Sequence, residues 1–95
     1  MKNSKLFSKI LKALANEKRL KILKLLLDNG EYNVMEISEE LKMPFRTISR
    51  HLERLRSADL VEFRQQGLQN YYSIPDLDQT MIKDLLKFIQ KYYRN

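Results

Sequence analysis

The fold is decided by residues 44–74, which read PFRTISRHLERLRSADLVEFRQQGLQNYYSI. In the first half, Ile48, Leu52 and Leu55 fall in one sector when about 100° is allowed per residue, as in a helix. In the second half, apolar and polar residues alternate in two short runs separated by Gly67, which is typical of strands. Glycine readily takes the positive φ of a tight hairpin turn. The stretch therefore predicts a helix followed at once by a β-hairpin.

Three more helices are predicted before this stretch. An apolar stripe runs along residues 5–14, and Asn16 is placed to cap a second helix that ends before Gly30. Asn33, followed three positions later by Glu36, resembles a capping box that opens a short third helix.

The last two helices also carry start signals. Pro44 suits the first turn of the fourth helix, because its missing N–H would have no intrahelical partner there. Asp76 and Gln79 can cap a final helix, expected over residues 77–93. The order is four helices, a two-stranded hairpin and a fifth helix. We therefore expect a mainly α fold with a small β-hairpin, a winged helix-turn-helix, as a single domain over residues 1–95.

Composition narrows the function. The chain has 18 Lys and Arg against 12 Asp and Glu, a formal net charge of +6, which suits a polyanionic partner such as nucleic acid. It has no cysteine, and His51 is its only histidine, so thiolate sites and histidine clusters are excluded. There is also no glycine-rich phosphate loop and no cluster of carboxylates. We expect no metal site, no cofactor and no enzymatic activity.

Nothing in the sequence predicts a membrane protein. The longest apolar runs are three residues, far short of a bilayer span. The first segment, MKNSKLFSKILKAL, is interrupted by lysines and has no small-residue cleavage site, so it does not resemble a signal peptide. We expect a cytoplasmic location and no membrane partner.

The fourth helix is the candidate DNA reader. Its apolar sector includes Phe45, which places Arg46 and Arg50 on the opposite side, one turn apart. The major groove admits an α-helix, and the guanidinium fork of arginine matches the O6 and N7 acceptors of guanine. Bases are read mainly by the N-terminal part of such a helix. The residues predicted to contact DNA are Phe45, Arg46, Thr47, Ser49, Arg50 and Arg54. The alternative is a charged helix face that only meets water.

Other charged side chains of this helix have other expected roles. Arg54 and Arg56 lie further along it, where a phosphate contact or an intramolecular pair is expected. His51 lies at the edge of the apolar sector, so we expect a partly buried structural histidine, with a phosphate contact as the alternative.

The hairpin is the candidate wing. Its tip is polar, and the same amides that form an ordinary loop can contact phosphates or the minor groove. Tyr71 and Tyr72 face opposite sides of their strand, and we expect Tyr72 in the core while the role of Tyr71 stays open. The predicted wing contacts are Arg64, Gln65, Gln66, Gln69 and Asn70.

Three segments, LKALANEKRLKILKLL, ISEELKMPFRTISRHLERLRSADLV and FRQQGLQNYYSI, together resemble the ArsR/SmtB family of transcriptional repressors over residues 6–90. The resemblance implies a homodimer that binds an inverted repeat in double-stranded DNA and is released by an effector. It also implies that helices 5–14 and 77–93 build the dimer interface. The residues of their apolar stripes assigned to that interface are Leu6, Phe7, Ile10, Ile82, Leu85, Phe88, Ile89 and Tyr92.

The chain departs from the family in its sensory residues. Many members bind metals through cysteines of the third helix, where this chain has Asn33 and Met35. Other members use aspartate and histidine on the last helix, but Asp78 and Asp84 have no histidine nearby. Leu68 stands where an arginine often follows the wing glycine. We therefore expect a regulator that is not a classical metal sensor.

Two other functions remain open at this level. A sequence-tolerant architectural DNA-binding protein would bind all duplexes with similar affinity and strong salt dependence. A winged-helix module for protein–protein contact would instead dock an acidic partner on the same basic face. The effector, an unidentified small molecule or protein, is also open.

Overall fold

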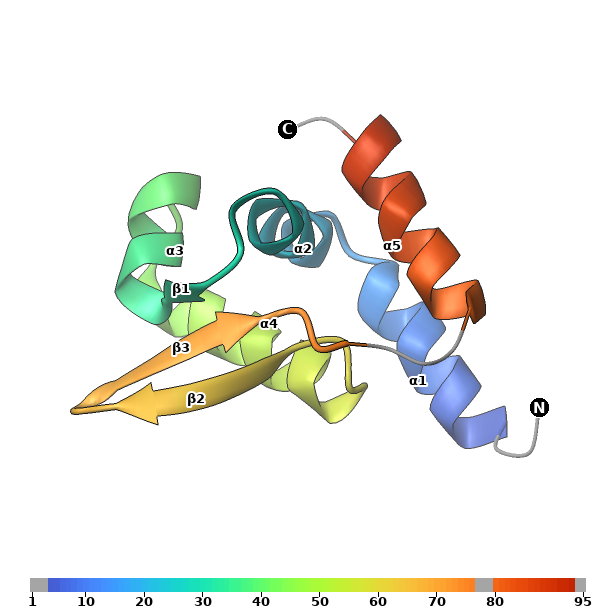
Figure 1. The fold of residues 1–95 in the computed structure, drawn as a ribbon. Helices are drawn as coiled ribbons and strands as arrows, with labels where there is room; N and C mark the ends of the chain where they lie inside the picture. The colour runs from blue at the N-terminus through green and yellow to red at the C-terminus, as the bar shows by residue number, and fades with distance from the viewer. Residues whose placement is uncertain (1–3, 77–79, 94–95) are drawn as a thin grey trace.

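The computed structural model describes residues 4–76 and 80–93. Within them, the order of helices and hairpin strands agrees with the expected one, and a short additional strand precedes the third helix (Figure 1). The elements are α1 (Ser4–Leu14), α2 (Glu17–Asn29), β1 (Tyr32–Asn33), α3 (Val34–Leu41), α4 (Phe45–Ser57), β2 (Glu62–Gln66), β3 (Gln69–Ser73) and α5 (Thr80–Tyr92). The expected helix 77–93 is thus seen from Thr80, and Asp78 and Gln79 lie outside the described residues.

The hairpin is part of a three-stranded antiparallel sheet in the order β1-β3-β2. Tyr72 is the central residue, opposite Tyr32 of β1 on one side and Phe63 of β2 on the other. Sequence analysis missed β1, because two residues are too few to show alternation. The consequence is that the base of the wing is joined to the chain just before α3, while its tip projects away from the helices (Figure 1).

One apolar core holds the helices and the base of the wing together. It takes Leu23 from α2, Ile37 from α3 and Leu52 from α4, all fully buried. Leu60 and Tyr72 extend this core under the sheet, which confirms the expectation for Tyr72. Because α4 is held along its inward face by several neighbours, its outward face has a defined orientation.

The helix ends are held by the expected side chains. The side chain of Asn16 accepts a hydrogen bond from the N–H of Arg19 at 3.1 Å. Asn33 and Glu36 form the capping box, at 2.8 and 2.9 Å. Both satisfy N–H groups that lack intrahelical partners. Pro44 precedes the first residue of α4 rather than lying in its first turn, one position earlier than expected.

Phe45 is a correction to the sequence-based expectation. It shares the angular sector of Leu52, yet 57% of its surface is exposed. The physical reason is its place at the start of α4, since helical side chains lean toward the N-terminus. Its ring therefore extends beyond the turns of the helix that pack on the core.

Candidate nucleic-acid interface

The turn between α3 and α4 sets the angle of the candidate reading helix. Lys42 ends α3 in the left-handed conformation, with φ of 55°. The N–H of Met43 then donates to the carbonyl of Ser38 at 3.2 Å, and the hydroxyl of Ser38 donates to the carbonyl of Met43. This pair of bonds closes a tight turn and fixes α4 relative to α3.

The outward side of α4 is basic. Arg46, Arg50 and Arg54 are exposed, while Thr47 and Ser49 are half-buried at its borders. Within the part of the chain that the structure describes, neither Arg46 nor Arg50 forms an ion pair or a side-chain hydrogen bond. Their donors are available to a partner from outside the molecule. Phe45 adds an exposed ring at the start of the same helix.

Arg56 has an internal partner. Its guanidinium lies 3.0 Å from a carboxylate oxygen of Glu53, one turn earlier, and stands over the ring of Phe63. The hydrogen bond to Glu53 raises the pKa of Arg56. The intramolecular alternative expected for Arg56 is therefore the one observed.

His51 is half-buried, as expected, and bonded to a cation. Nη1 of Arg19 donates to Nδ1 of His51 at 3.2 Å. Because arginine is only a donor, Nδ1 must accept, which places the proton of a neutral imidazole on Nε2. Burial lowers the pKa of His51, and the charges of Arg19, Lys18 and Arg54 lower it further. His51 thus links α4 to the start of α2.

The wing arginine is not free. Arg64 donates two hydrogen bonds to the carboxylate of Glu31, both 2.8 Å long, and a third to the side chain of Gln66. Its guanidinium also stands 5.0 Å from the centre of the Tyr71 ring. The hydrogen bond from Arg64 lowers the pKa of Glu31. Glu31 was missed in the sequence because 33 positions separate it from Arg64.

The tip of the wing is polar except for one residue. Gln65, Gln66 and Gln69 are exposed, and Asn70 is half-buried. Leu68, which follows the turn glycine, is 99% exposed. The turn glycine, Gly67, has φ of 63°, as the hairpin pattern predicted.

The residues expected at a dimer interface divide into three groups. Ile10, Ile82 and Ile89 are buried in the core of the protomer itself, so they have little surface left for a partner. Leu6, Phe7 and Leu85 are half-buried. Phe88 and Tyr92 are 61% and 57% exposed, with ring centres 4.7 Å apart. Leu11, also exposed, was not among the expected residues.

The candidate sensory positions have structural roles or none visible. Asn33 caps α3, and Met35 is exposed on the same helix. No group of three or more metal-binding side chains occurs in residues 4–76 and 80–93. In the same residues, no helix combines the length and the apolar character needed to cross a bilayer.

A model of bacterial regulatory proteins of the ArsR family matches residues 16–62, from the cap of α2 to the start of β2. The transcriptional activator HlyU of Vibrio cholerae is 38% identical over 92 residues, which are 97% of this chain and 82% of HlyU. The chain belongs to the ArsR family. The transcriptional repressor PagR of Bacillus anthracis is 40% identical over 83 residues, 87% of this chain and 83% of PagR.

Solved structures resemble this ArsR-family protein along almost its whole length. HlyU superposes with a TM-score of 0.80 at 37% identity, covering 97% of this chain and 96% of that one. A homodimeric winged helix-turn-helix DNA-binding domain from Mycobacterium bovis superposes with a TM-score of 0.77 at 34% identity, covering 95% and 82%. The ArsR-family chain is a transcriptional regulator with the winged helix-turn-helix fold.

Proposed function

We propose that this regulator acts as a homodimer that binds an inverted repeat in double-stranded DNA, with α4 in the major groove and the wing beside it. The observation that carries the proposal is the position of Arg46 and Arg50. Both are exposed on the outward face of a helix whose inward face, at Ile48 and Leu52, is fully buried. A rigid helix therefore offers two unpaired guanidinium groups, one turn apart.

The chemistry of this face suits base reading. A guanidinium can donate two hydrogen bonds to O6 and N7 of one guanine. Arg46 lies in the first turn of α4, where base contacts concentrate in helix-turn-helix proteins. Thr47 and Ser49, at the borders, can donate to bases or phosphates. The amides of the wing, Gln65 and Gln66 among them, supply contacts that depend little on sequence.

The dimer follows from the exposed aromatic pair of α5. Phe88 and Tyr92 form an apolar surface that a second copy would remove from water. The homodimeric Mycobacterium bovis domain, similar over 95% of this chain, supports this arrangement. A two-fold axis would place two α4 helices in successive major grooves, about 34 Å apart.

Repression is the proposed outcome of binding. A dimer seated on a promoter excludes the polymerase from the same DNA, and no further contact is needed. The likeness to the repressor PagR supports this direction, whereas HlyU is an activator. No cysteine is present to bind a metal, so we propose regulation by an organic molecule, a protein partner or concentration alone.

Selection from random duplex DNA tests the proposal. We expect an enriched inverted repeat whose half-sites are about one helical turn apart. Affinity should then be measured on the enriched repeat and on a scrambled duplex across a salt series. Equal affinity for both duplexes would contradict sequence-specific binding and indicate an architectural protein. Absence of binding at low salt would indicate a protein partner for the basic face.

A further inference from the structure

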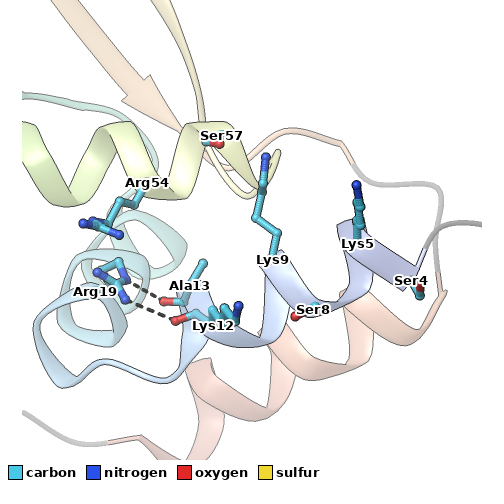
Figure 2. Close-up of a pocket in the computed structure, with 9 residues that line it drawn as sticks. All are labelled: Ser4, Lys5, Ser8, Lys9, Lys12, Ala13, Arg19, Arg54 and Ser57. Carbon is cyan, nitrogen blue, oxygen red and sulfur yellow. Dashed lines mark hydrogen bonds between the residues drawn. The ribbon is translucent and has the colours of Figure 1, made fainter.

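A basic pocket lies between α1 and the C-terminal half of α4. Its volume is about 560 Å³, and five of the nine residues that line it are cations. These are Lys5, Lys9 and Lys12 of α1, Arg19 of α2 and Arg54 of α4. Three serines and an alanine complete the lining, which contains no carboxylate. Figure 2 shows Lys9 reaching from α1 toward the last turn of α4, and Arg54 reaching from α4 toward Arg19.

Arg19 is a fixed positive charge in this pocket. Its Nε donates to the carbonyl of Ala13 at 2.8 Å, and Nη2 donates to the carbonyl of Lys12 at 3.1 Å, as Figure 2 shows. Its remaining bond is to Nδ1 of His51. All three acceptors are neutral, so they hold the guanidinium without balancing its charge. Burial and the charge of Arg54 lower the pKa of Arg19, as expected for cations crowded together.

The lysines of α1 lie on one side of the helix. At about 100° per residue, Lys5, Lys9 and Lys12 fall within about 60° of each other. Ile10 and Ala13, which are buried in the core, lie on another side. None of the three lysines has an ion-pair partner among the residues that the structure describes. Local charge balance is therefore left to an anion from outside.

The lining indicates which kind of anion fits. Pockets for small organic ligands are mostly apolar, with a few polar groups that fix orientation. This pocket is lined almost entirely by cations and hydroxyls, the groups that contact phosphates of the DNA backbone. It also continues the basic side of α4. Arg46, Arg50 and Arg54 follow one another every four residues, about 6 Å apart along the helix axis.

We propose that this pocket binds backbone phosphates at the edge of the groove that α4 enters, which makes the lysine side of α1 part of the DNA-binding surface. The inference rests on the proposed function and deepens it. Arg54 would then contact phosphate together with Arg19, while Arg46 and Arg50 read bases. The contact carries no sequence information, and it adds the same affinity to every duplex.

The test is the salt dependence of DNA binding by Lys9→Ala, Lys12→Ala and the double variant. Both side chains are exposed, and the carbonyl of Lys12 that binds Arg19 is kept. The slope of log K against log salt should become shallower by about 0.9 for each phosphate that the variant no longer neutralises. Affinity at 0.1 M salt should fall roughly 5–10-fold per lysine, equally on the enriched repeat and on a scrambled duplex. Lys87→Ala, the same change on an exposed site of α5, is the matched control and should leave the slope unchanged.

The outcomes separate this inference from the function on which it rests. If the wild-type protein bound no duplex at any salt, the proposed function would fail and the inference with it. If the wild-type protein bound DNA and both lysine variants kept its slope, only the inference would be overturned. Calorimetry with inorganic phosphate provides the second arm. Phosphate binding that disappears in the double variant, together with an unchanged DNA slope, would make the pocket a small-anion site and overturn the proposal.

Discussion

The arginines of α4 and the wing differ in what holds them. Arg56 and Arg64 are bonded to carboxylates of the same chain, whereas Arg46 and Arg50 have no such partner within the described residues. A bound carboxylate must be displaced before an arginine can contact DNA fully. Position on an outward face is therefore necessary for base reading, and freedom from internal pairs decides which arginines can do it.

Arg50→Ala should cost about 1–3 kcal/mol of binding free energy on the enriched repeat and relax the base preference at one position. The reason is the loss of a bidentate contact that only one base pair offers. Fluorescence anisotropy on the repeat and on single-base variants of it measures both effects. A uniform loss on every duplex would show instead that Arg50 contacts phosphate. Arg56→Ala, which removes a paired arginine, should change the base preference little.

Glu31→Gln should increase affinity for DNA of any sequence. The change removes the carboxylate that holds Arg64 and leaves its guanidinium available to phosphates. Asp84→Asn removes one negative charge from an exposed site of α5 and serves as the matched control. Binding of a scrambled duplex at fixed salt compares the two variants. An equal gain in both would mean that net charge alone is responsible, and a loss in Glu31→Gln would show that the ion pair holds the wing in its binding position.

At the scale of elements, the orientation of α4 depends on contacts along its whole length. The turn at Lys42 fixes its beginning, and the bond between His51 and Arg19 ties its middle to α2. Arg19 also bonds the last carbonyls of α1. One guanidinium thus joins three helices, and its acceptor on α4 is the only histidine of the chain.

This junction predicts that stability falls in mild acid. The pKa of His51 is lowered in the folded state below its ordinary 6.5, chiefly by burial and then by the nearby cations. The unfolded chain therefore binds the proton more readily. The contribution is present above pH 6.5 and is lost as the pH falls from there toward the folded pKa. Thermal unfolding between pH 8 and 5 should show the loss, and His51→Gln, which keeps an acceptor without a titrating group, should reduce it. An unchanged pH profile in His51→Gln would contradict this assignment.

At the scale of the whole molecule, two kinds of surface stand out against the common core. One is basic and runs from α4 to the lysine side of α1. The other is apolar and includes the rings of Phe88 and Tyr92 on α5. Since α1 and α5 lie at the end of the molecule away from the tip of the wing, a dimer built there would leave the wing free (Figure 1).

Phe88→Glu should convert the dimer to a folded monomer. A charge placed in the apolar surface would have to be buried without a partner, which disfavours association. The side chain is mostly exposed in the protomer, so the fold itself should survive. Analytical ultracentrifugation measures the mass, and circular dichroism checks the fold. Met35→Glu, the same type of change at an exposed apolar site of α3, should leave the mass unchanged. A dimer that persists in Phe88→Glu would place the interface elsewhere.

The order of helices and hairpin, the caps at Asn16 and Asn33, and the outward position of Arg46 and Arg50 could all be read from the amino-acid sequence. These features are local, because a cap, a turn or a helix face depends on residues at most a few positions apart. Periodicity also indicated the winged helix-turn-helix, since its elements follow one another along the chain in a characteristic order.

Only the tertiary structure decided which of those faces are covered. It paired β1 with β3, joined Arg64 to Glu31, and brought Arg19 against His51. It also buried Ile10, Ile82 and Ile89 in the protomer, left Phe45 exposed and gathered the cations of three helices around one pocket. The physical reason is that a period in the sequence orients a side chain relative to its own element. Which element then packs over it depends on contacts between residues tens of positions apart, and no local pattern records them.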